Sequence, residues 1–78
     1  MENNISEYTL GALRRYVDDK LQPGGFLTAV LENDLFGAFA RADHLNQVTM
    51  FQIVKHIFNN EPSGCHGYKG VVEEWCKK

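Results

Sequence analysis

Four side chains in the second half of the chain are of types that bind metal ions: His56, Cys65, His66 and Cys76. Thiolate and imidazole groups suit a tetrahedral zinc site with two cysteine and two histidine ligands. The spacing does not fit such a site, because Cys65 and His66 are adjacent and neither end of the set has the short cysteine or histidine spacing of zinc motifs. We therefore predict no metal and no cofactor, and these four residues remain candidates only for an alternative, minor zinc-binding module.

Cys65 together with His56 or His66 also supplies the residue types of an activated nucleophile. Catalysis would need an orienting group, an oxyanion hole and a concave site in addition. A chain of 78 residues has little interior left for such a pocket once its helices are packed. We therefore predict that the protein is not an enzyme.

The composition indicates one folded domain. Hydrophobic residues make up 44% of the 78 positions and aromatic residues 12%, which is ordinary for a globular protein and argues against disorder. We expect residues 1–78 to form a single helical domain, because this length supports only one core. The net charge of −2 and the scattered lysines and arginines disfavour nonspecific binding to nucleic acid.

No segment has the features of a membrane span or an export signal. No apolar run approaches the roughly 20 residues that cross a bilayer. The N-terminal sequence MENNISEYT has neither the basic start nor the apolar centre of a signal peptide. We therefore expect a cytoplasmic protein whose two cysteines stay reduced.

The first expected helix begins near Asn4 or Ser6, either of which can cap its N-terminus. Its predicted apolar stripe, at helical spacing, consists of Leu10, Leu13, Val17 and Leu21. The next segment, Gln22-Pro23-Gly24-Gly25, ends the helix because proline lacks a backbone donor and glycine allows positive φ. So short a connection predicts that the first two helices lie side by side and antiparallel.

The stretch from Phe26 to Ala42 is the most apolar helix-forming segment of the chain. Its expected core-facing stripe consists of Leu27, Leu31, Leu35, Ala38 and Ala42. Phe36 and Phe39 lie off this stripe, so the predicted helix is apolar nearly all round. Such a helix is either central in the fold or exposed to a partner.

A third, amphipathic helix is expected from Leu45 to Asn60, after Asp43 as its N-cap. Its predicted apolar side consists of Met50, Phe51, Ile53, Val54, Ile57 and Phe58. A single kinked helix from Phe26 to Asn60 is the alternative. A short helix from Tyr68 to Trp75 follows a cluster of helix-breaking residues. We therefore predict an all-α fold, a small bundle of four helices in which three main helices precede a short C-terminal one.

The surplus apolar surface of the second helix is the basis of our functional prediction. We expect a non-enzymatic protein that binds another protein, and a homodimer is one way to cover the same surface. The residues expected at the interface flank the core stripe: Phe26, Glu32, Asp34, Phe36, Phe39 and Arg41. For Asp34, an internal hydrogen bond or an ion pair is the alternative role.

A small DNA-binding regulator is the main alternative function. A helix-turn-helix around Ala42-Asp43 would use residues 45–59 as its recognition helix. The exposed side of that helix offers Asn46, Gln52, Lys55 and His56 but no arginine. Specific readers of DNA usually depend on arginine and on cations that contact phosphates, so nucleic acid is not the expected partner.

Three segments carry a resemblance to a group of known proteins: Gly24-Gly25-Phe26-Leu27, the ENDL sequence from Glu32 to Leu35, and Pro62-Ser63-Gly64-Cys65-His66-Gly67. Together they resemble small uncharacterised proteins encoded by tailed bacteriophages and prophages, over most of the chain. The resemblance implies a bacterial cytoplasm and an accessory role during infection or lysogeny, exerted by binding a host or phage protein. It implies no chemistry and no functional residues.

Overall fold

The computed structural model describes residues 5–78, and in this range it contains helices and no strand. The helices are α1 (Glu7–Asp19), α2 (Gly25–Leu31), α3 (Leu35–Arg41), α4 (His44–Val48), α5 (Met50–Asn60), the 3₁₀ turn η1 (Ser63–Cys65) and α6 (Val71–Cys76). The prediction of an all-α fold is confirmed. The described residues form six α-helices rather than four, because two of the predicted helices are each divided.

Helix α1 starts where the sequence indicates. The Ser6 hydroxyl accepts a hydrogen bond from the Thr9 backbone N–H at 3.1 Å, so Ser6 is the N-cap. The competing cap, Asn4, lies outside the described residues. Lys20 ends the helix in the left-handed conformation with φ 61°. Leu21 therefore falls beyond the helix and is exposed, which corrects its predicted place in the apolar stripe.

The predicted helix from Phe26 to Ala42 is wrong as a single element. Asn33 has φ 62°, a conformation that asparagine tolerates better than most residues and that stops α2. The Asp34 carboxylate then accepts the Gly37 backbone N–H at 3.0 Å and starts α3 as its N-cap. Because α3 has a new direction, Leu35 is 56% exposed instead of core-facing, whereas Leu31 is fully buried.

The predicted helix from Leu45 to Asn60 is also divided. Asp43 caps α4 by accepting the Asn46 backbone N–H at 2.8 Å, which confirms the predicted cap. Thr49, with φ −107° and ψ 13°, separates α4 from α5. Its hydroxyl donates a 2.8 Å hydrogen bond to the Leu45 carbonyl. A threonine hydroxyl that bonds to the preceding turn favours such a bend.

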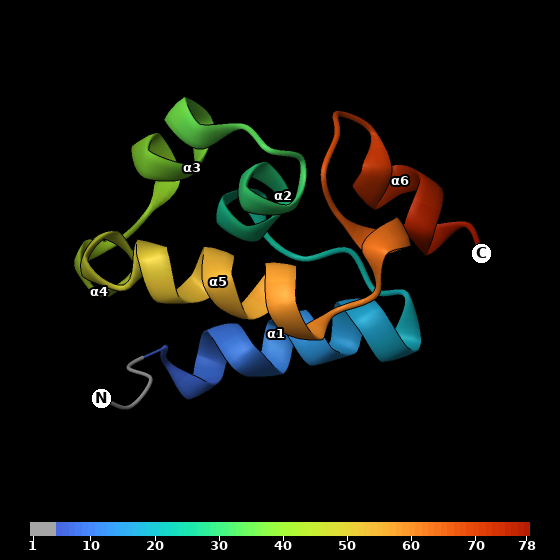
Figure 1. Cartoon of the computed structure of the whole chain (residues 1–78), viewed down its shortest axis with the longest axis horizontal. Helices are drawn as coiled ribbons and strands as arrows, with labels where there is room; N and C mark the ends of the chain where they lie inside the picture. The colour runs from blue at the N-terminus through green and yellow to red at the C-terminus, as the bar shows by residue number, and fades with distance from the viewer. Residues whose placement is uncertain (1–4) are drawn as a thin grey trace.

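Two helices lie side by side along the length of the molecule. In Figure 1, α1 and α5 run next to each other in the same direction, and Leu13, Ile53 and Ile57 from these helices share one core cluster. Helix α2 is seen nearly end-on above them, so it crosses α1 steeply and the predicted antiparallel hairpin is wrong (Figure 1). Helix α2 packs mainly against α3 and also touches α6.

The core centres on Tyr16, a residue absent from the predicted stripe of α1. Tyr16 is completely buried. Its hydroxyl donates to the Cys65 carbonyl at 2.7 Å, and its own carbonyl accepts the Trp75 indole N–H at 3.0 Å. These bonds connect α1 to η1 and α6, which are distant in sequence. The loop before α6 is held to α2 by a 2.7 Å bond from the Gly67 N–H to the Leu31 carbonyl.

Candidate functional site

The cysteines are poorly placed for nucleophilic chemistry. Both are free thiols. Cys65 is completely buried, and burial, followed by the nearby Glu61 charge, raises the pKa of its thiol to about 11. A reactive cysteine needs the opposite, a lowered pKa and access to solvent. Cys76 is half-buried against the core as a small hydrophobic residue.

The two candidate histidines have different surroundings. His56 Nε2 lies 3.2 Å from the Glu61 carboxylate, and His56 Nδ1 lies 3.3 Å from the Asn60 amide nitrogen. His66 lies in the loop before α6 and lines a groove between α2 and α5. Within residues 5–78, no three histidine, cysteine, aspartate or glutamate side chains converge so that they could hold a metal ion. The four zinc-ligand candidates are thus not brought together.

The polar side that a DNA-reading helix would present is partly turned inward. The Asn46 side-chain oxygen accepts the Thr9 hydroxyl at 3.3 Å, and the Gln52 side-chain oxygen is buried without a hydrogen-bond partner. His56 pairs with Glu61. Of the four residues proposed to read bases, Lys55 alone is exposed.

Four of the six predicted interface residues have structural roles. Phe26 packs between the two core clusters. The Glu32 carboxylate accepts the Val72 N–H at 3.4 Å near the start of α6. Asp34 caps α3, and Arg41 donates from Nη1 to the Gly37 carbonyl at 3.2 Å. Asp34 therefore takes the alternative role, an internal hydrogen bond.

The other two predicted interface residues, Phe36 and Phe39, are exposed on α3. Phe36 is 85% exposed, although it is one of the largest apolar side chains in the chain. Phe39 lies one helical turn further along and is less exposed.

Helix α5 exposes part of its predicted apolar side. Met50, Ile53 and Ile57 are buried, at positions i, i+3 and i+7. The exposed residues Phe51, Val54 and Phe58 repeat the same spacing one position later. The sequence therefore contains two adjacent apolar stripes, and the small core covers only the first. The second, Phe51, Val54 and Phe58, is called the α5 stripe below.

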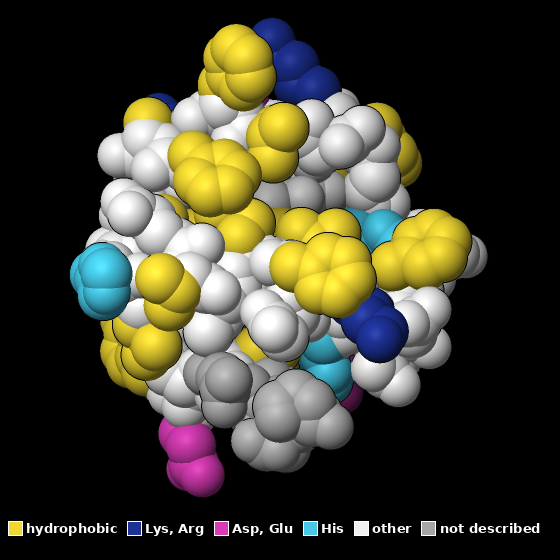
Figure 2. All heavy atoms as spheres, turned by 60° about the vertical axis from the view of Figure 1, so that its left-hand side comes forward, with side chains coloured by type: hydrophobic (Ala, Val, Ile, Leu, Met, Phe, Trp, Pro, Cys, Tyr) yellow, Lys and Arg dark blue, Asp and Glu magenta, His cyan; other side chains and the backbone are white. Residues whose placement is uncertain are grey.

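The exposed apolar residues are concentrated in one part of the chain. Of the eleven large hydrophobic residues that are exposed among residues 5–78, eight lie on α3, α4 and α5. They are Leu35, Phe36, Phe39, Leu45, Val48, Phe51, Val54 and Phe58, and we call them the apolar face. Figure 2 shows hydrophobic side chains gathered on this side of the molecule, with several aromatic rings projecting from it.

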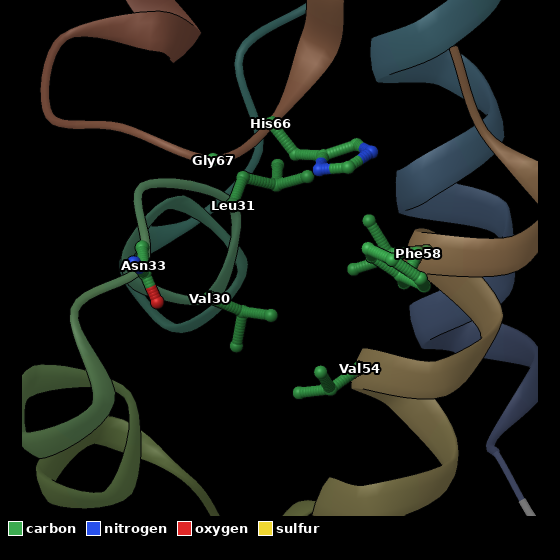
Figure 3. Close-up of a pocket in the computed structure, with 8 residues that line it drawn as sticks. Val30, Leu31, Asn33, Val54, Phe58, His66 and Gly67 are labelled. Atoms are coloured by element: carbon green, nitrogen blue, oxygen red, sulfur yellow. The ribbon is translucent and has the colours of Figure 1, made fainter. Parts of the chain in front are cut away.

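A groove beside the α5 stripe belongs to this face. It has a volume of about 350 Å³ and lies between α2 and α5, with the loop before α6 at one end. In Figure 3, Val30 from α2 and Val54 from α5 point toward one another across it. A second hollow of about 180 Å³ shares Val30, Asn33 and Val54 with the groove and extends to Leu35 on α3.

One polar atom at the groove has no partner. His66 lines the groove together with Phe58, and its Nε2 atom is buried without a hydrogen bond. A buried polar atom without a hydrogen bond is unfavourable.

The charges along this part of the chain are few and balanced. Residues 33–60 contain two acidic side chains, Asp34 and Asp43, and two basic ones, Arg41 and Lys55. The Lys55 ammonium lies 5.8 Å from the centre of the Phe51 ring, which it partly covers. The face is thus close to neutral at pH 7 when its histidines are uncharged.

No helix in the described part of the chain is long and apolar enough to cross a membrane. Comparison with family models, with curated proteins and with solved structures found no match.

Proposed function

We propose that this chain is a non-enzymatic accessory protein that acts by binding another protein through its apolar face. The observation that carries the proposal is the concentration of eight exposed large hydrophobic residues on α3, α4 and α5. A buried aromatic side chain contributes roughly 150–250 Å² of contact area, so Phe36, Phe51 and Phe58 alone expose an area comparable with the largest patch of a typical monomer, about 300–600 Å².

In this proposal, helix α3 supplies the main anchor residue of the interface. Phe36 projects almost completely into solvent from a helix that is fixed at its start by the Asp34 cap. An aromatic side chain on a rigid element loses little conformational freedom on binding, which favours it as an interface anchor. The resemblance to phage and prophage proteins supports a host or phage protein in a bacterial cytoplasm as the partner.

Affinity capture from a bacterial lysate, followed by mass spectrometry, tests the proposal. The wild-type chain is expected to retain a partner that the F36K/F39K variant loses, because two charges in the contact would have to be desolvated. Tyr8→Lys is the matched control, since Tyr8 is 83% exposed but lies on α1, outside the apolar face. Equal capture by F36K/F39K and wild type would contradict the role of α3.

A further inference from the structure

The α5 stripe has the residue spacing of a helix that docks into a groove on a partner. Phe51, Val54 and Phe58 are at positions i, i+3 and i+7, the spacing of anchor residues in helix-in-groove recognition. The two phenylalanines are 71% and 77% exposed. Charged residues do not interrupt the stripe, because Lys55 is the only lysine, arginine, aspartate or glutamate in α5.

The groove next to this stripe is of a size to receive such anchors. A cavity of about 150 Å³ is enough to hold one benzene molecule. The groove of about 350 Å³ therefore has room for a phenylalanine ring together with an aliphatic side chain. Most of its lining is apolar: Val30, Leu31, Val54, Ile57 and Phe58. The same side of the chain thus carries both a projecting apolar stripe and a groove with room for one of its aromatic rings.

The balanced charge and the exposed area of the apolar face favour contact between two copies of this face. A strongly charged face would repel its own copy, but the two acidic and two basic side chains of residues 33–60 leave this one balanced. The eight residues of the face are 43–85% exposed. With about 150–250 Å² for each aromatic residue, their combined exposed area approaches the roughly 800 Å² that one partner contributes to a standard interface.

We infer that a second copy of this chain covers the apolar face in the free protein, in a two-fold symmetric dimer in which a phenylalanine of the α5 stripe enters the groove of the other copy. Such a self-complementary interface uses the same residues on both subunits. The inference rests on the proposed function in assigning a binding role to this face, and it names the occupant of the face when no other partner is present.

Light scattering coupled to size-exclusion chromatography tests the inference on the full chain. The wild-type protein is expected to have twice the mass of one chain, and F51K/F58K the mass of one chain. Tyr8→Lys is expected to stay dimeric, because it places a lysine at a more exposed aromatic position that is not part of the apolar face. Circular dichroism confirms that each variant is folded, and F58S replaces the double variant in the comparison if that variant loses helicity.

The inference is overturned if the wild-type chain is monomeric at about 1 mM, a concentration that reveals even millimolar dissociation constants. A dimer that persists unchanged in F51K/F58K also overturns it. These results are distinguishable from failure of the proposed function. A monomeric wild-type chain that captures a lysate protein through Phe36 and Phe39 overturns the second copy alone. A dimer that F51K/F58K dissociates supports the inference even when no lysate protein is captured.

Discussion

Tyr16→Phe is expected to lower the free energy of unfolding by about 1–3 kcal/mol, because it leaves the Cys65 carbonyl without its hydrogen bond in the core. The hydroxyl donates to that carbonyl at 2.7 Å and is buried. Burial, followed by the nearby Cys65, raises the pKa of Tyr16, so the hydroxyl keeps its proton and remains a donor throughout the neutral range. Thermal unfolding followed by circular dichroism should show a midpoint lower by roughly 5–20 °C.

Tyr68→Phe is the matched control for this change. The Tyr68 hydroxyl also donates a 2.7 Å hydrogen bond, to the Glu74 carboxylate, but this bond is exposed to solvent. Water replaces a lost partner at an exposed site, so the expected change is within about 0.5 kcal/mol. A change within about 0.5 kcal/mol for Tyr16→Phe as well would show that the bond between α1 and η1 does not stabilise the fold.

Leu31→Ala is expected to lower the free energy of unfolding by about 2–5 kcal/mol. Leu31 is fully buried in the main core cluster and also lines the groove. Its removal leaves a cavity between α2 and its neighbours that the small domain fills only partly. A protein of this size has about 5–15 kcal/mol of stability in total, so much of the population could unfold on moderate heating. Chemical denaturation measures the loss.

Val54→Ala provides the comparison within the same groove. Val54 lines the groove opposite Val30 but is 46% exposed, so it contributes less to the core. We expect a loss below about 1 kcal/mol in the monomer. A loss as large as that of Leu31→Ala, measured when the reference protein and the variant are both monomeric, would mean that the α5 stripe is part of the core and not a contact surface.

The local signals in the sequence were sufficient for the fold class and for several helix ends. The Asp43 cap follows from a short-range pattern that the structure confirms. The break at Asn33 was missed, because a single left-handed residue leaves the apolar pattern of the flanking residues intact. The following Asp34 was the available signal, since an aspartate that precedes an apolar run is a typical N-cap.

The packing depended on contacts that sequence periodicity does not specify. The pattern of α5 showed that six residues are apolar, but the area of the neighbouring helices decides how many of them are covered. Met50, Ile53 and Ile57 are buried, and the α5 stripe is not. Tyr16 was missed for a related reason, since its burial depends on η1 and α6, which contact it from 49 and 59 residues away.

The central claim, that the apolar face is a protein-binding surface, is tested most directly by photo-crosslinking in living bacteria. A benzophenone amino acid takes the place of Phe36 or Phe58 on the face, or of Tyr8 on α1 as the control. We expect discrete adducts at positions 36 and 58, with a second copy of the chain or with another protein, and none of these adducts at position 8. Absence of adducts at both face positions, or the same adducts at position 8, would contradict the claim.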